Sequence, residues 1–157
     1  MNLQSQRISP ISVQRANTED APMLTRLAIA SKASWGYSSE WMAEASVYLQ
    51  ISTEYITRNP VYKAVSDGEI AGWYGLLLRD DTAWLDNLWV APAFFGQGTG
   101  SRLFRHAVEI ARGEGATRLE LESDSNAVGF YLKMGMQITG ERLSEMGRTL
   151  PLMGMEI

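Results

Sequence analysis

Hydrophobic and polar positions along the chain repeat with two periods, and the changes between these periods delimit the predicted elements. Alternation predicts strands at 11–15, 61–66, 69–78, 82–90, 117–123, 136–142 and 148–157. Helical spacing predicts one helix from the NTEDAP segment to near residue 36, a second at about 38–51, a short turn from 53 to before 60, and helices at 98–112 and 125–134. Cap residues, glycines and prolines set these boundaries.

The order of the elements predicts the fold class. Asp67-Gly68 joins two alternating segments and supplies the positive φ that a tight β-hairpin needs. In the middle of the chain a strand, a glycine-rich loop, a helix and another strand follow one another, so the strands flanking that helix are expected to run parallel. We therefore predict an α+β fold with one mixed, mostly antiparallel sheet of about seven strands, helices on both faces, and strands four and five parallel.

Composition narrows the chemistry and the partners. The 157 residues include no cysteine and one histidine, His106, which excludes disulfides, thiolate metal sites and multi-histidine metal sites. The net charge of −4 disfavours nucleic acid and suits a cationic substrate. No apolar stretch approaches the roughly 20 residues of a membrane span, and the first ten residues lack the order of a secretory signal, so we expect a cytoplasmic protein. Residues 1–9 are expected to form a flexible tail before a single domain at 10–157.

The loop between the fourth strand and the following helix gives the sharpest local signal. It reads VAPAFFGQGTGS from Val90 to Ser101. Glycines let backbone N–H groups approach an anion, and the free amides at a helix N-terminus hold it, so the loop is typical of a phosphate cradle. No lysine follows the glycines and the spacing is not G-x-G-x-x-G, which disfavours nucleotide hydrolases and dinucleotide binders. A connection that only permits tight helix–strand packing stays open as the alternative.

A second signal lies where a short helix follows the fifth strand. The segment NAVGFYLKMG, from Asn126 to Gly135, places Tyr131 on that helix. Together with the glycine loop, at this distance and in this order of strands, it resembles the GNAT superfamily of acetyl-CoA-dependent N-acetyltransferases, and in particular bacterial members of unassigned substrate. The resemblance covers nearly the whole chain, from Arg15-Ala16 through LWVAP at 88–92 to Gly135.

The resemblance implies how coenzyme A binds. A bulge in the fourth strand would splay it from the fifth, and the backbone of Leu88 and Val90 would pair with the pantetheine arm while their side chains stay in the core. Further residues near the cofactor would be Asp124, Asn126 and Tyr131. The pyrophosphate would accept bonds from the backbone amides of Gly96, Gln97, Gly98, Thr99, Gly100 and Ser101.

Three positions depart from the usual family pattern. Phe95 stands where the family usually has arginine or glutamine, so phosphate binding would depend more on the backbone. The asparagine that commonly precedes the tyrosine by seven residues is Asp124, while Asn126 precedes it by only five; either residue can cap the helix instead. Gly135-Met136 replaces the usual Gly-Phe and should preserve packing.

Amine acetylation needs a base and an acid. An alkyl amine is about one part in 2,500 neutral at pH 7, so a carboxylate must take its proton. Asp86, Glu120 and Glu122 are the candidates, and Asp86 is preferred because it lies nearest to the expected thioester. A phenol stays protonated at pH 7, so Tyr131 suits the role of donor to the departing thiolate, with helix-to-sheet packing as the alternative.

Aromatic side chains indicate an acceptor pocket, because rings can bind a cation over their faces. The same rings also fill cores and dimer contacts, so both interpretations stay open. Arg142 and Arg148 could contact a substrate carboxylate or be surface charges. The candidate acceptor residues are Trp35 and Tyr37, in the loop between the first two helices, and Trp73 and Tyr74, on the third strand.

The sequence favours an enzyme that transfers an acetyl group from acetyl-CoA to a primary amine by direct attack in a ternary complex. The expected acceptor is a small molecule, with a peptide or protein amine as the less favoured choice, and no metal takes part. A non-catalytic acyl-CoA sensor and an interaction module without cofactor remain as alternatives. The resemblance also allows a homodimer.

Overall fold

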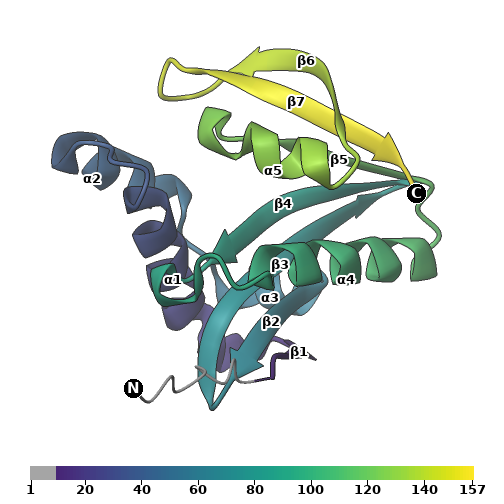
Figure 1. Cartoon of the computed structure of the whole chain (residues 1–157), viewed down its shortest axis with the longest axis horizontal. Coiled ribbons are helices and arrows are strands. Elements are labelled where there is room, and N and C mark those ends of the chain that lie inside the picture. Colours follow the sequence, from purple (N-terminus) through teal and green to yellow (C-terminus); the bar gives the residue numbers. More distant parts are fainter. Residues whose placement is uncertain (1–9) are drawn as a thin grey trace, which may run out of the picture.

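The computed structural model describes residues 10–157, which form one seven-stranded sheet with the strand order β1-β2-β3-β4-β5-β7-β6 (Figure 1). The predicted tail at 1–9 lies outside the described residues. The strands are β1 (Ser12–Arg15), β2 (Val61–Ser66), β3 (Glu69–Arg79), β4 (Thr82–Val90), β5 (Arg118–Glu122), β6 (Gln137–Leu143) and β7 (Thr149–Glu156). The α-helices are α1 (Ala21–Ala33), α2 (Ser39–Tyr48), α3 (Thr53–Arg58), α4 (Thr99–Gly113) and α5 (Val128–Lys133).

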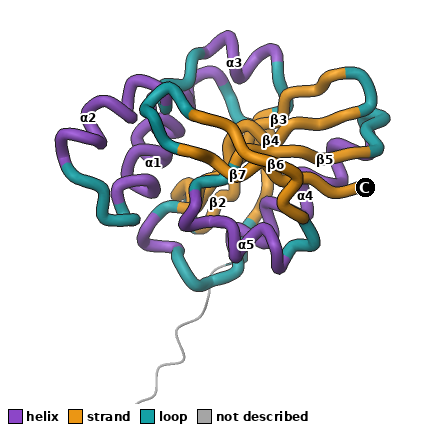
Figure 2. The backbone as a smooth tube through the Cα atoms, turned by 90° about the horizontal axis from the view of Figure 1, so that it is seen from above, coloured by secondary structure: helices purple, strands orange, loops and turns teal. Residues whose placement is uncertain are grey.

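The pairing of the strands confirms the predicted fold class. Every neighbouring pair is antiparallel except β4 and β5, which run parallel and are connected along the chain through α4. Helices α1 and α3 pack on one face of the sheet, and α4 and α5 pack on the other (Figure 2). No described helix combines the length and apolar character needed to cross a membrane.

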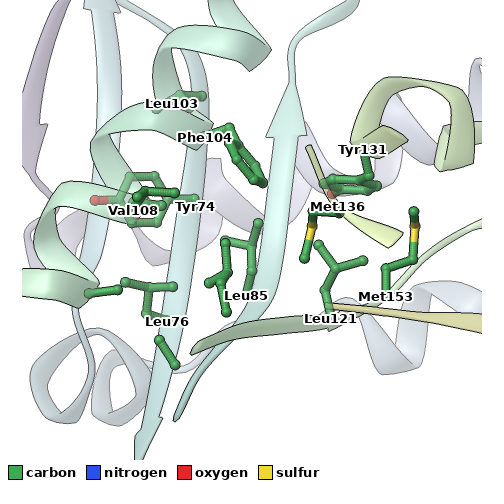
Figure 3. Close-up of a cluster of buried hydrophobic side chains, with 14 of the residues drawn as sticks. Tyr74, Leu76, Leu85, Leu103, Phe104, Val108, Leu121, Tyr131, Met136 and Met153 are labelled. Atoms are coloured by element: carbon green, nitrogen blue, oxygen red, sulfur yellow. The ribbon is translucent and has the colours of Figure 1, made fainter. Parts of the chain in front are cut away.

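The central strand β3 is buried on both faces. Trp73 and Tyr74 are adjacent on it and point to opposite sides, each with no exposed surface. Trp73 packs with the α1 side and donates its indole N–H to the Leu24 carbonyl oxygen at 3.0 Å. Tyr74 belongs to the larger core under α4 (Figure 3). Its hydroxyl lies 2.6 Å from Nδ1 of His106. His106 is therefore a partner of the core and not an isolated surface residue.

An irregularity in β4 opens the sheet. Gly75 of β3 is opposite Asn87, but the next pair is Leu76 with Leu85, so Asp86 is an extra residue and forms a β-bulge. On its other side β4 pairs with β5 only at 82–84. Beyond residue 84 the two strands separate, which agrees with the splay implied by the resemblance.

Candidate functional site

A pocket of about 810 Å³ lies where β4 and β5 no longer pair. One wall is the second half of β4, and another is the segment 94–101 with the start of α4. The remaining walls come from α1, the end of α2, the junction of β5 with α5, and the connection of β6 with β7. The predicted site residues that line it are Trp35, Asp86, Leu88, Val90, Phe95, Gly96, Gly98, Thr99, Gly100, Ser101, Asp124, Asn126 and Tyr131.

The glycine loop presents a run of free backbone amides to this pocket. Gly96 and Gly98 have φ values of 75° and 79°, which favour glycine. Within the described part of the chain, none of the amides at 96–101 donates a hydrogen bond, and the first to do so is Arg102, to the Gly98 carbonyl at 3.1 Å. The buried hydroxyl of Thr99 also lacks a partner there. Six free N–H groups at the positive end of a helix dipole fit a phosphate or pyrophosphate.

The second half of β4 leaves one backbone edge unpaired. Ala91 donates to the Ala71 carbonyl of β3 at 2.8 Å, so by alternation the N–H and C=O groups of Leu88 and Val90 point away from β3. On that side β5 has already separated from β4. These groups are therefore available to an extended ligand that adds to β4 as a strand would.

Tyr131 closes the pocket from α5. Its ring packs against Phe104 and Phe130, with centroids 6.2 and 5.1 Å away, and the residue is buried. No other described group forms a hydrogen bond with its hydroxyl. Burial raises the pKa of the Tyr131 phenol. The hydroxyl is consequently protonated at neutral pH and can act as a donor.

Asp86 occupies the bulge of β4 and lines the same pocket. Its Oδ2 atom accepts hydrogen bonds from the Tyr55 hydroxyl at 2.8 Å and from the Asn87 side-chain amide at 3.2 Å. Trp89 donates its indole N–H to the other end of that amide at 2.9 Å. The carboxylate is thus held by neutral donors from α3 and β4.

The charges on the pocket walls are unequally paired. Lys32 pairs with Asp124 at 2.5 Å, and Arg142 pairs with the two lining glutamates at 2.5 and 3.3 Å. Asp86 alone among the lining carboxylates has no cationic partner in the described chain. An unpaired carboxylate in a pocket favours an incoming cation. The lining carboxylates are Asp86, Glu122, Asp124 and Glu145, and the lining cations are Lys32 and Arg142.

Asp124 is the centre of a hydrogen-bonded cluster at the start of the α5 segment. It accepts bonds from Lys32, from the Tyr37 hydroxyl at 2.7 Å, and from the backbone and side chain of Asn126, both at 2.9 Å. Arg148 donates to the same Tyr37 hydroxyl at 2.8 Å. Burial raises the pKa of Asp124, but the bonds from Lys32, Asn126 and Tyr37 outweigh it and hold that pKa below its usual value. Asp124 thus caps the short 3-10 helix Ser125–Ala127, and both Asp124 and Asn126 anchor the Tyr37 hydroxyl.

The stacked rings of Tyr37 and Trp41 contact cations of the chain itself. Tyr37 stacks on Trp41 with centroids 4.0 Å apart. The Lys32 ammonium lies 5.5 and 5.6 Å from these two ring centroids and 6.0 Å from that of Trp89. Arg148 covers the stack at 4.8 and 5.2 Å. Of the rings expected to receive an acceptor amine, Tyr37 therefore contacts the chain's own lysine and arginine.

Two candidate acceptor residues, Trp73 and Tyr74, lie in the core and not in the pocket. Trp73 and Tyr74 are fully buried because β3 is covered by helices on both faces, and neither lines the pocket. Tyr37 also lies outside the lining, while Trp35 is 47% exposed and does line it. The side chain of Gln97 points elsewhere and donates to the Ala93 carbonyl at 3.5 Å.

Sequence reasoning missed Lys32 and Tyr55. Both contacts cross long distances along the chain, from Lys32 to Asp124 and from Tyr55 to Asp86, so no local spacing connects their members. Gly75 was the one available hint for the second contact, because it lies opposite the bulge and a Cβ there would collide with the Tyr55 hydroxyl. No group of three or more potential metal ligands occurs among the described residues.

Comparison with known proteins identifies related chains. The model of the acetyltransferase (GNAT) family matches residues 25–136. A Bacillus subtilis protein named as a ribosomal protein bS18-alanine N-acetyltransferase is 34% identical over 109 residues, which are 68% of this chain and 70% of that protein. The peptidyl-lysine N-acetyltransferase YjaB of Salmonella typhimurium is 31% identical over 107 residues, again 68% of this chain and 70% of that protein.

Among solved structures, the PaiA N-acetyltransferase of Thermoplasma acidophilum in complex with coenzyme A has the same fold. The TM-score is 0.79 at 20% identity, and the alignment covers 94% of this chain and 99% of that one. At this level of identity the likeness concerns the fold alone.

Asp124→Asn is expected to lower the free energy of unfolding at pH 7 by about 1–3 kcal/mol, because Lys32 loses its partner. The native pKa of Asp124 is lowered, so its stabilising charge is present above the unfolded value of about 3.9 and is lost as the pH falls through the native pKa. The difference between wild type and variant should therefore shrink between pH 7 and pH 3 in urea unfolding. Glu54→Gln, which breaks the exposed pair with Arg58, is the control with little effect. A difference that stays constant with pH would contradict this role of Asp124.

Proposed function

The chain belongs to the acetyltransferase (GNAT) family, and from this premise we propose that it transfers the acetyl group of acetyl-CoA to a primary amine carried by a peptide or protein. The chain is an acetyltransferase, and acetyl-CoA is its donor. The peptide acceptor replaces the small-molecule amine favoured by the sequence, because the two relatives above are named for an alanine amine of a ribosomal protein and for peptidyl lysine.

The observation that carries the proposal is the position of Asp86. It is the one carboxylate on the pocket wall without a cationic partner in the described chain, and it stands in the strand gap with the free edge of β4 and Tyr131. An alkylammonium is drawn to such a group. The same carboxylate can then take the proton that the amine must lose before it attacks.

The donor fits the residues present. The free amides at 96–101 suit the pyrophosphate, and the unpartnered hydroxyl of Thr99 adds a polar group beside them. The unpaired backbone of Leu88 and Val90 suits the amide groups of the pantetheine arm. Among the described residues that line the pocket, none of those at 94–101 is a lysine or arginine, and Phe95 occupies the position before the glycines, so binding there depends on backbone donors.

The reaction joins the amine nitrogen to the acetyl carbon and breaks the carbon–sulfur bond. Bound acetyl-CoA supplies an activated acyl group with a thiolate leaving group. Asp86 accepts the proton released by the amine, and Tyr131 donates a hydrogen bond or proton to the departing sulfur. The backbone N–H of Leu88 in β4, which points away from β3, stabilises the negative charge that develops on the carbonyl oxygen.

The mouth of the pocket supports a large acceptor. Trp35, Tyr48 and Phe95 line it and are 47, 59 and 46% exposed. Exposed aromatic side chains around a pocket are typical of surfaces that contact another molecule. A peptide that delivers its amine to Asp86 would lie across these rings, whereas a small amine would leave most of them uncovered.

Gly98→Asp is expected to raise the Kd for acetyl-CoA about tenfold or more, because it places a side chain and a negative charge among the free amides. Gly68→Asp is the matched control: Gly68 has a φ of 78°, close to the 79° of Gly98, but lies in the β2–β3 turn. Backbone strain is therefore similar in the two variants. Calorimetry should give a wild-type Kd for Gly68→Asp, and equal affinities in both variants would reject the loop as the phosphate site.

Tyr131→Phe should lower kcat roughly 10²-fold or more while the Kd for acetyl-CoA stays near that of wild type. The substitution keeps the packed ring and removes only the donor hydroxyl. Tyr62→Phe is the control, since Tyr62 is a tyrosine of β2 outside the pocket lining. If turnover is equal in both variants, Tyr131 has no part in the reaction.

Release of the coenzyme A thiol tests the proposed function. The acceptors are a pentapeptide with a free N-terminal alanine and no lysine, a pentapeptide with one lysine and blocked ends, and n-butylamine. We expect kcat/KM for at least one peptide to exceed that for n-butylamine about tenfold or more, and Asp86→Asn to reduce it about 10²-fold or more. Equal rates with n-butylamine would return the acceptor to small amines. Acetyl-CoA binding without release by any amine would identify a sensor instead.

A further inference from the structure

The side chain of Tyr55 reaches Asp86 from the opposite side of the sheet to Tyr131. It lies on α3, whose start is fixed by Ser52, because the Ser52 hydroxyl accepts a bond from the Tyr55 backbone amide at 3.0 Å. The phenol then passes over β3 at Gly75, where a Cβ would collide with its hydroxyl. The glycine opposite the bulge thus leaves the space through which Tyr55 contacts β4.

The hydrogen bonds around Asp86 occupy one of its two oxygens. Tyr55 donates to Oδ2 at 2.8 Å, and the Asn87 amide donates to the same atom at 3.2 Å and to the Tyr55 hydroxyl at 3.0 Å. Trp89 fixes the orientation of that amide. No described group donates to Oδ1. One oxygen is therefore held by the protein and the other is free to receive a proton.

Toward Asp86 the Tyr55 hydroxyl acts only as a donor. Burial, and then the neighbouring Asp86 charge, raise the pKa of the Tyr55 phenol, so it does not ionise near neutral pH. The other titratable groups that line the pocket do not contact Asp86. Lys32 is paired with Asp124, and Arg142 is paired with both Glu122 and Glu145. Neither Tyr48 nor Tyr131 bonds to Asp86.

We propose that Tyr55 is the positioning residue of the reaction: its hydroxyl holds Oδ2 of Asp86 so that Oδ1 takes the proton of the acceptor amine. This inference rests on the proposed function, because it gives Asp86 the role of base. Tyr55 itself neither gains nor loses a proton.

Tyr55→Phe in the full chain tests this, with Tyr62→Phe as the control. The first readout is the NMR chemical shift of the Asp86 carboxyl carbon at pH 7 in the protein without ligands. Loss of the donated bond should move that resonance in Tyr55→Phe and leave it unchanged in Tyr62→Phe. The second readout is turnover with the better of the two peptides. We expect kcat to fall about tenfold and KM for acetyl-CoA to stay constant.

Gly75→Ala provides a second variant that leaves Tyr55 in place. Its methyl group displaces the phenol, so it should reproduce the change in the Asp86 carboxyl resonance and add little in the Tyr55→Phe background. An Asp86 carboxyl resonance and a kcat in Tyr55→Phe equal to those in Tyr62→Phe would overturn the proposal. The resonance does not depend on turnover, so a wild-type protein that acetylates no amine would reject the proposed function while the comparison of resonances still decides whether Tyr55 holds Asp86.

Discussion

Strand β4 cannot pair with both neighbours along its whole length, because Asp86 is one residue too many for its register with β3 and its pairing with β5 ends at Trp84. Several features of the site lie at this break. The strands separate, backbone groups of Leu88 and Val90 lose their partners, and a pocket forms in the gap. The bulged residue Asp86 lies on the wall of that pocket.

The unequal pairing of charges gives the gap its chemistry. Lys32 and Arg142 form ion pairs with the other carboxylates of the pocket wall. Lys32 and Arg148 also lie over the ring of Tyr37. An incoming ammonium therefore meets one open anion, Asp86, next to a free strand edge. The glycine loop contributes the opposite preference, since its free amides attract an anion. We propose that donor and acceptor bind at different ends of one cavity because of these opposite charges.

The fold could be predicted from the sequence because its signals are local. The Asp67-Gly68 turn, the glycines after β4 and the inner face of α4 each act over a few residues, and strand order and the parallel pair followed from them. The glycine loop was found for the same reason.

The acceptor side of the pocket, around Asp86 and Asp124, could not be predicted in this way. Trp73 and Tyr74 have the composition of a pocket, yet β3 is central and helices cover both of its faces. Burial of this kind depends on how layers stack, which local alternation does not encode. Tyr55 reaches Asp86 only through the space above Gly75, and Lys32 reaches Asp124 from α1. Such contacts appear only when distant elements meet.

We propose that the free edge of β4 and the amides of the glycine loop together bind acetyl-CoA. Amide hydrogen exchange by NMR, with and without saturating acetyl-CoA, tests it residue by residue. We predict slower exchange at Leu88 and Val90 and within 96–101, with no comparable change at the amides of the β2–β3 turn. Binding that leaves those amides unchanged, and protects another surface instead, would contradict the account.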